Sequence, residues 1–306
     1  MQTILGAGGA IGTELTKALP KFTKDIRLVG RNPIKVNDSD IIHKADLLNK
    51  EEVIKAVEGS EIVYLTVGLV YKTKIWEEQW PIVMKNAIEA CKTHNAKLVF
   101  FDNVYMYDRD ALKHMTEKTP VRPTSDKGRV REKVANMVMN AHEKGDIQSL
   151  IARAADFIGP INSVPTETIY KNIAKGKKAD WFASLNMIHS FTDTVDAAIG
   201  TAILGNAETS FGEVWHLPTD PTPLTVMQWI ELFAKEMKVP AKGRALPIWT
   251  MGILGVFMPV LKELKEMTYQ YDRDYYFDSS KFNRRFEYTP ATPAISVKRV
   301  VDYLKE

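Results

Sequence analysis

The sequence predicts an α/β fold with a doubly wound parallel sheet and a second, smaller, mostly helical lobe. The first half alternates strand-like and helix-like segments, and the second half is irregular and punctuated by prolines. The chain has 306 residues, of which 45% are hydrophobic, so it can bury a full core as one large unit or as two unequal lobes.

Each element of the first half follows from hydrophobic spacing. Short apolar runs predict strands, and apolar residues at three- and four-residue spacing predict helices. The predicted strands are Gln2–Leu5, Asp25–Val29, Asp40–His43, Glu61–Leu65, Lys97–Phe101 and Ser149–Arg153. The predicted helices are Ile11–Leu19, Asn49–Val57, Trp76–Thr93 and Ser125–Glu143.

After Arg153 the alternation of strand-like and helix-like segments becomes less regular. Helices are predicted at Pro165–Lys175, Phe191–Gly205, Leu224–Met237 and Ser296–Lys305, and a strand at Glu213–Leu217. We expect residues 1–158 and 190–217 to form the sheet domain, and residues 159–189 and 218–306 to form the smaller lobe.

Charge and cysteine content narrow the class of protein. The net charge of +3 comes from 41 basic and 38 acidic residues without a dense basic block, which argues against a nucleic-acid partner. Cys91 is the single cysteine, so a reducing, cytoplasmic setting fits, and no signal segment is expected at the start. The apolar run Ala245 to Leu261 contains prolines and glycines and predicts a buried or pocket-lining helix, not a membrane span.

A glycine cluster lies between the first predicted strand and the first predicted helix. Glycines there let the chain turn sharply and bring backbone N–H groups and a helix N-terminus close to a pyrophosphate. A strand before and a helix after are the context that a dinucleotide-binding loop requires. The expected cofactor contacts in this loop are Gly6, Gly9, Ala10, Ile11 and Gly12.

The end of the second strand suggests which dinucleotide binds. NAD-binding proteins of this type usually place an acidic residue there, on the ribose 2′-hydroxyl. This chain has Arg31 and Asn32, with Lys35 nearby. Because a guanidinium can fork onto a 2′-phosphate, we expect these three residues to bind NADP. In the alternative interpretation, Arg31 stacks on the adenine or points to solvent.

Taken together, these motifs resemble those of the extended short-chain dehydrogenase/reductase family, also called NAD-dependent epimerase/dehydratases, over nearly the whole chain. Gly6, Gly9 and Gly12 match its G-x-x-G-x-x-G spacing. The resemblance implies a Rossmann-type fold and a cofactor-binding role for further residues. These are Asp46 and Leu47 after the third strand, Thr66, Val67 and Gly68 after the fourth, and Ala154 and Phe157 in the segment Arg153 to Pro160.

The family's Tyr-x-x-x-Lys catalytic pair is missing. The resemblance places Lys127 at the tyrosine position and Arg131 at the lysine position, both expected to contact the cofactor. Asn103 falls where the family has serine or threonine, and Tyr105 falls where its sugar dehydratases have glutamate. We expect Tyr105, assisted by Lys127 and Asn103, to act as a relocated acid/base, since a nearby cation lowers the pKa of a phenol.

These residues predict an NADP(H)-dependent oxidoreductase that transfers a hydride to or from a carbonyl, hydroxyl or activated double bond. Several predicted wall residues are aromatic, Trp249 among them, which favours a small apolar or aromatic substrate. One alternative is a non-catalytic NADP-binding sensor, and a further alternative is a sugar epimerase or dehydratase. The six histidines show no metal-site spacing, so no metal is expected. We expect a monomer or a homodimer.

Overall fold

The computed structural model describes residues 1–248, 263 and 265–305. The chain forms two compact units. Unit 1 comprises Met1–Val104, Lys127–Ala154 and Ala197–Leu217, and unit 2 comprises Tyr105–Asp126, Ala155–Asp196 and Pro218–Glu306. The segment Tyr105–Asp126 therefore lies in unit 2, whereas the division expected from the sequence kept it with the sheet domain.

Unit 1 is built on a seven-stranded parallel sheet with the strand order β10-β6-β5-β4-β1-β2-β3. The strands are β1 (Gln2–Leu5), β2 (Ile26–Gly30), β3 (Ile41–Lys44), β4 (Ile62–Leu65), β5 (Lys97–Asp102), β6 (Ser149–Arg153) and β10 (Val214–His216). The winding direction reverses between β1 and β4, which are adjacent. In open sheets of this kind, ligands bind outside the carboxyl ends of the strands at such a reversal.

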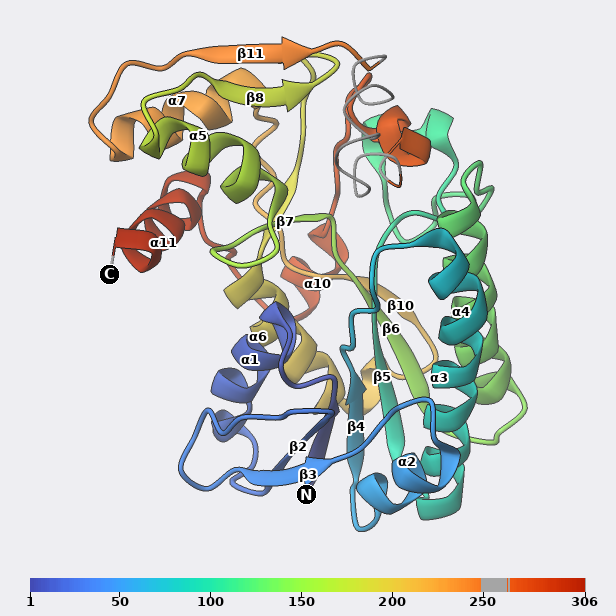
Figure 1. Ribbon diagram of the computed structural model, residues 1–306. Coiled ribbons are helices and arrows are strands. Elements are labelled where there is room, and N and C mark those ends of the chain that lie inside the picture. Colours follow the sequence, from blue (N-terminus) through green and yellow to red (C-terminus); the bar gives the residue numbers. More distant parts are fainter. Residues whose placement is uncertain (249–262, 264, 306) are drawn as a thin grey trace. The chain divides into compact units, whose positions relative to one another are not determined.

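Helices cover both faces of this sheet (Figure 1). They are α1 (Ala10–Ala18), α2 (Lys50–Val57), α3 (Thr73–His94), α4 (Asp126–Glu143) and α6 (Thr194–Gly205). Helices α2, α3 and α4 lie on one face, and α1 and α6 lie on the other (Figure 1). The predicted doubly wound α/β fold is confirmed, and the predicted strands and helices of the first half differ from the observed ones by a few residues at their ends.

Burial explains why these runs form central strands. All residues of β1, β4 and β6 are buried, as expected for strands covered by helices on both faces. Strand β3, by contrast, lies at the edge and is mostly exposed. Helix α2 is capped by Asn49, whose side chain accepts hydrogen bonds from the N–H groups of Glu51 and Glu52. Helix α3 is capped at its C-terminal end by Asn95, which adopts a left-handed conformation with φ of 52°.

A buried polar network ties β1 and β4 to the end of α6. The Tyr64 hydroxyl donates to Gln2 Oε1 at 2.8 Å and accepts from Asn206 Nδ2 at 3.1 Å. Gln2 Nε2 also donates to Asn206 Oδ1 at 2.6 Å. These bonds satisfy the polar groups of the buried Gln2 and Tyr64 and of the half-buried Asn206.

Replacing Tyr64 with phenylalanine is expected to lower the free energy of unfolding by about 1–3 kcal/mol, because Gln2 and Asn206 then lose a buried partner. Urea denaturation of the variant and the wild type measures this difference. Tyr303→Phe serves as a control, because Tyr303 is exposed. Equal stability of Tyr64→Phe and the wild type would contradict a stabilising role for the network.

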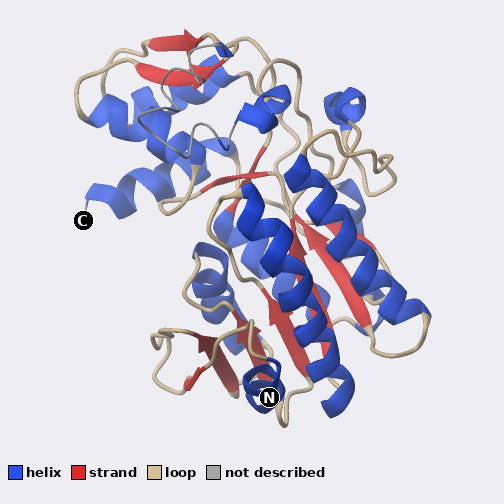
Figure 2. Ribbon diagram, turned by 45° about the vertical axis from the view of Figure 1, so that its right-hand side comes forward, coloured by secondary structure: helices blue, strands red, loops and turns tan. Residues whose placement is uncertain are grey.

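Unit 2 contains two pairs of parallel strands among short helices (Figure 2). The strands are β7 (Asp156–Ile158) with β9 (Phe191–Asp193), and β8 (Ala179–Phe182) with β11 (Gly243–Leu246). The helices are η2 (Arg109–His114), η3 (Thr166–Tyr170), α5 (Lys171–Ala174), α7 (Val226–Glu236), η5 (Lys265–Gln270), α10 (Ser280–Arg285) and α11 (Pro293–Lys305). Two short helices, η1 (Leu19–Lys21) and η4 (Glu208–Ser210), belong to unit 1.

The predicted helix Phe191–Gly205 needs a correction, because its first three residues form β9 and the helix starts at Thr194. Pairing with β7 leaves these residues buried in an extended conformation. The side chain of Asp193 then accepts from the N–H groups of Val195 and Asp196 at the start of the helix. Tertiary strand pairing has overridden local periodicity here.

The apolar run Ala245 to Leu261 lies largely outside the described residues, as does Trp249. Its first two residues, Ala245 and Leu246, end strand β11. Within the described part of the chain, no helix combines the length and the apolar character that a membrane crossing requires.

Candidate active site

The glycine-rich loop follows β1 at the sheet reversal and turns at Gly6. Gly6 has a φ of +99°, a conformation that residues with a side chain rarely adopt. A Cβ on Gly12 would lie 2.6 Å from the carbonyl oxygen of Gly6. The loop therefore requires glycine at both positions, one for its backbone angle and the other for the close approach of α1 to the turn.

The start of α1 is open to an anion. Gly9 is its N-cap and supplies no side-chain hydrogen bond to the first turn, which contains Ala10, Ile11 and Gly12. A Cβ placed on Gly8 would meet no atom within 4 Å. Backbone N–H groups and the positive end of the helix dipole are the features that bind pyrophosphate. The residues present fit a dinucleotide at this place.

The loop after β4 packs directly against the glycine-rich loop. A Cβ on Gly6 would lie 2.4 Å from the Cα of Val67, so the two backbones are in contact. Thr66 donates its N–H to the carbonyl of Leu5 at 2.9 Å. A Cβ on Gly68 would meet nothing within 4 Å. The structure thus brings together two groups of predicted cofactor residues that are sixty positions apart in the sequence.

The other predicted cofactor residues lie at the ends of neighbouring strands. The Asp46 side chain is exposed after β3 and accepts from the N–H of Leu48, and the carbonyl of Leu47 accepts from Asn86 Nδ2 at 3.0 Å. Ala154 is buried after β6 and donates its N–H to the carbonyl of Asp102 at 3.1 Å. Phe157 lies in β7 of unit 2. Their assignment to the cofactor stays a prediction.

Arg131, at the expected lysine position, is held in a buried ion-pair cluster. Its Nε donates to Asp102 Oδ1 at 2.8 Å, and Arg153 Nε donates to Asp102 Oδ2 at 3.0 Å. The guanidinium of Arg131 also lies over the rings of Trp80 and Phe100, at 4.3 and 4.7 Å from their centroids. The side chains of Arg131 and Arg153 are 3% and 5% exposed, and that of Asp102 is 0% exposed. This cluster joins α4 to the ends of β5 and β6.

Lys127, at the expected tyrosine position, is fully buried near the start of α4. Its Nζ donates to Thr73 Oγ1 at 2.8 Å and lies 4.7 Å from the centroid of the Tyr71 ring. Tyr71 lies in the β4–α3 connection, and Thr73 is the first residue of α3. Neither Tyr71 nor Thr73 was predicted as a site residue.

Asn103 and Tyr105 follow β5. The backbone N–H of Asn103 donates to Asp102 Oδ1 at 2.9 Å in unit 1. Tyr105 belongs to unit 2, where its carbonyl accepts from the Tyr269 hydroxyl at 3.3 Å. The catalytic roles expected for Asn103, Tyr105 and Lys127 stay predictions.

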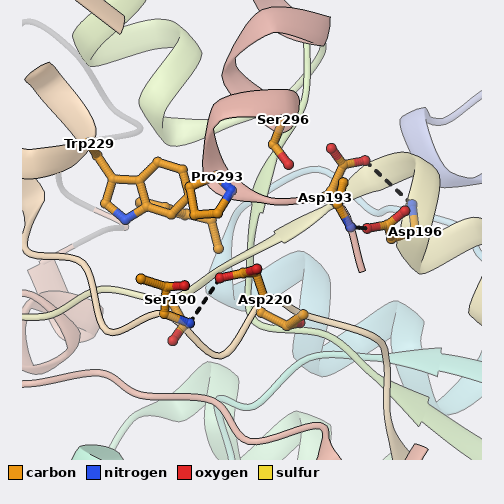
Figure 3. A pocket seen from close by; sticks show the side chains of 11 residues that line it. Ser190, Asp193, Asp196, Asp220, Trp229, Pro293 and Ser296 are labelled. Carbon is orange, nitrogen blue, oxygen red and sulfur yellow. Dashed lines mark hydrogen bonds between the residues drawn. The ribbon is translucent and has the colours of Figure 1, made fainter. Parts of the chain in front are cut away.

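A separate small pocket lies within unit 2 (Figure 3). It contains about 300 Å³ of unfilled space, part of it open to solvent. Its lining includes Ser190, Asp193, Asp196, Asp220, Trp229, Pro293 and Ser296. Arg299 Nη1 pairs with Asp193 Oδ1 at 2.9 Å, and Asp193 and Asp196 bond to the first turn of α6 and to Ala291. These carboxylates serve the local fold, and none of the predicted catalytic residues lines this pocket.

The described residues hold no group of three or more histidine, cysteine, aspartate or glutamate side chains that fits a metal ion. Cys91 is fully buried in α3, and burial raises the pKa of its thiol. A buried thiol with a raised pKa is a poor nucleophile.

A doubly wound parallel sheet with a glycine-lined helix N-terminus at its reversal point defines a dinucleotide-binding α/β protein of the Rossmann type. Residues 3–212 match the NAD dependent epimerase/dehydratase family. The chain belongs to this family, as the resemblance of its motifs implied. Comparison with curated protein sequences finds no match.

Solved structures of sugar epimerases and dehydratases share the fold. UDP-glucuronic acid 4-epimerase from Bacillus cereus, in complex with NAD, has a TM-score of 0.81 and 18% identity, covering 100% of this chain and 99% of that one. dTDP-glucose 4,6-dehydratase from Bacillus anthracis, also with NAD, has a TM-score of 0.81 and 14% identity, covering 99% and 96%. UDP-glucose 4-epimerase from Thermus thermophilus, with NAD, has a TM-score of 0.77 and 14% identity, covering 100% and 99%.

The prediction of NADP as the cofactor is wrong, because the family is NAD dependent and these relatives were solved with NAD. Arg31 and Asn32 are exposed after β2, and Lys35 Nζ donates to the carbonyl of Asp38 at 3.0 Å. An exposed guanidinium can equally stack on the adenine or face solvent, which is the alternative interpretation given for Arg31.

Sequence reasoning missed the partners of the two buried cations. Asp102 was visible as a charged residue ending an apolar strand, a signal that predicts a buried ion pair. Tyr71 and Thr73 carry no such signal, since no fixed spacing links them to Lys127. Only the packing of α4 beside the β4–α3 connection brings them together.

Proposed function

We propose that this chain is an NAD-dependent enzyme of the epimerase or dehydratase kind, acting on a hydroxyl-bearing small molecule. The glycine-lined N-terminus of α1 at the β1–β4 reversal carries the proposal, because its geometry suits a dinucleotide pyrophosphate. Membership of the family supports it, as do relatives that are sugar epimerases and dehydratases. A sugar epimerase or dehydratase was one of the alternatives that the motifs left open, and it replaces the expected net NADP-dependent hydride transfer.

The residues have distinct parts in this proposal. The backbone N–H groups of the first turn of α1 hold the pyrophosphate, and the Thr66 to Gly68 segment borders the ribose. NAD, when bound, supplies a hydride acceptor that can return the hydride within one cycle. Tyr105 exchanges a proton with a substrate oxygen, and Asn103 orients that oxygen by hydrogen bonding.

A second candidate is a non-catalytic NAD-binding sensor. One observation favours it. Arg131, at the position expected for the family's catalytic lysine, forms a buried ion pair with Asp102. A sensor binds the dinucleotide but leaves it unconsumed, so turnover separates the two candidates.

The test is NAD binding by calorimetry, followed by incubation of the NAD-loaded protein with a panel of sugars and nucleotide sugars. Products are followed by NMR, and reduced cofactor by absorbance. The proposal expects binding of NAD in preference to NADP and a changed sugar without net accumulation of NADH. Product matched by an equal amount of NADH would instead indicate a net oxidoreductase, and binding without any product would favour the sensor.

Tyr105→Phe is expected to lower kcat by about a hundredfold or more, with NAD affinity unchanged, because a general acid–base group contributes rate enhancement of roughly this size. The matched control is Tyr303→Phe, which alters an exposed tyrosine on α11. A Tyr105→Phe enzyme that turns over at the wild-type rate contradicts the role of this hydroxyl.

A further inference from the structure

We propose that unit 2 carries a surface that docks on an anionic membrane. This surface, the lysine patch, consists of two connections that lead into neighbouring strands. Residues 175–178 connect α5 to β8, and residues 237–242 connect α7 to β11. All of them belong to unit 2. The inference goes beyond the proposed function, because docking requires neither NAD nor substrate.

Strand pairing creates the patch. Strands β8 and β11 are parallel and pair Ala179 with Gly243, and the N–H of Ala179 donates to the carbonyl of Lys242 at 2.8 Å. Because parallel strands start at the same end of a sheet, the connections that precede them lie side by side (Figure 1). Two segments that are distant in the sequence thus place their lysines on one surface, namely Lys175, Lys177, Lys178, Lys238 and Lys242.

The lysines of the patch are exposed, and none of them forms an ion pair with a residue that the structure describes. The acidic residues nearby do not neutralise them. Asp180 pairs with Arg244 at 2.8 Å. Glu236, at the end of α7, is half-buried, and its charge acts on Lys298 of α11. The patch therefore presents a strong excess of positive charge to its surroundings.

Helix stability explains only part of this charge. A cation near the C-terminal end of a helix interacts favourably with the helix dipole, and Lys175 and Lys238 stand just after α5 and α7. Lys178 and Lys242 instead come directly before the paired residues of β8 and β11, so they are cross-strand neighbours. Like charges at such positions repel each other and destabilise the pairing. Charges that the fold itself does not need indicate an anionic partner.

The chemistry of the patch favours a lipid surface over a nucleic acid or a protein. Residues 175–178 and 237–242 include no arginine and no aromatic residue, the types that bind phosphate in bidentate fashion or stack on bases. Lysine is depleted in protein–protein interfaces, whose anchors are mainly aromatic residues and arginine. Clustered lysines, by contrast, are attracted to the negative surface of a bilayer without any fixed geometry.

Apolar residues at the tip of the second connection fit the same partner. Val239 is 41% exposed, and Pro240 and Ala241 beside it are also exposed. Lys238 and Lys242 flank these three residues. A small apolar tip enters the headgroup region while the flanking ammonium groups stay at the level of the lipid phosphates. The patch thus combines electrostatic attraction with a short apolar insertion.

Cosedimentation of the full-length protein with vesicles tests the proposal. Vesicles of phosphatidylcholine with about one-third phosphatidylserine are compared with vesicles of phosphatidylcholine alone. The partition coefficient is expected to be about a hundredfold or more higher for the anionic vesicles at about 0.1 M NaCl. At about 0.5 M NaCl this difference should nearly disappear, because salt screens charges at the membrane surface.

Lys178→Gln/Lys242→Gln is expected to lower the partition coefficient about twenty-fivefold, since each lysine near an anionic surface contributes about fivefold. Val239→Ser is expected to lower it about threefold, because less apolar surface leaves water. The matched control is Lys21→Gln/Lys24→Gln, which removes the same charge from an exposed part of unit 1 and should bind as the wild type does. Circular dichroism verifies that each variant is folded.

Equal binding to both kinds of vesicle, or binding to neither, overturns the proposal. Wild-type binding by Lys178→Gln/Lys242→Gln overturns it as well, as does an equal loss in Lys21→Gln/Lys24→Gln, because net charge would then be the cause. Tighter binding of a single-stranded oligonucleotide or an acidic peptide than of the anionic vesicles, at the same ionic strength, would replace the membrane by another class of partner. Failure of NAD binding affects the proposed function alone.

Discussion

Asp102→Asn is expected to lower the free energy of unfolding by about 3–5 kcal/mol, because removing one partner of a buried ion cluster leaves charges uncompensated in the interior. Here the charges are the guanidinium groups of Arg131 and Arg153, both bonded to the lost carboxylate. Urea denaturation followed by tryptophan fluorescence measures the loss, since Trp80 lies beside the cluster.

Asp146→Asn is the matched control in the same unit. Its carboxylate pairs with Lys92 at the surface, so this variant is expected to have nearly the stability of the wild type. A loss of less than about 1 kcal/mol for Asp102→Asn would mean that the cluster contributes little beyond an exposed pair. NAD binding by the surviving folded fraction shows whether the cluster acts on stability alone.

The second large effect is expected for Gly12→Ala. The added methyl group would lie 2.6 Å from the carbonyl oxygen of Gly6 and 2.8 Å from the Cα of Ala7, so α1 must move away from the turn. Displacing the helix N-terminus weakens the N–H contacts with a pyrophosphate, and the affinity for NAD is expected to fall about a hundredfold. Thermal unfolding with and without NAD, together with calorimetry, measures both consequences.

Gly8→Ala provides the control for a methyl group in the same loop. A Cβ there meets no atom within 4 Å, so the unfolding temperature without NAD should equal that of the wild type. Wild-type stability and NAD affinity in Gly12→Ala would contradict a steric requirement for glycine at this position. Equal destabilisation of Gly8→Ala and Gly12→Ala would contradict it as well.

Much of the fold was predictable because its signals are local. The strands β1, β4 and β6 are short apolar runs buried on both faces, and the helices between them show regular apolar spacing. The glycine loop was predictable for the same reason, since its steric demands act on consecutive residues. Strand β9 was mistaken for helix because its extended form depends on β7, more than thirty residues earlier.

The wrong prediction of NADP shows that closeness in sequence alone does not identify the cofactor. Arg31 and Lys35 are close in sequence, and their charges suggested a 2′-phosphate site. In the folded chain Lys35 bonds the carbonyl of Asp38, three residues away, and Arg31 remains exposed. Closeness in sequence does not by itself establish that two cations bind the same group.

The sequence by itself determined the class of fold and the family, because apolar periodicity and glycine geometry act within a few residues. The place of the dinucleotide stays a prediction. The tertiary structure alone decided what surrounds Arg131 and Lys127, the two cations that the resemblance to the family was expected to place at its catalytic positions. Arg131 is balanced by Asp102 from a neighbouring strand, and Lys127 meets Tyr71 from a different connection. Such pairings depend on how α4 packs across the sheet, which the spacing of residues in the sequence does not determine.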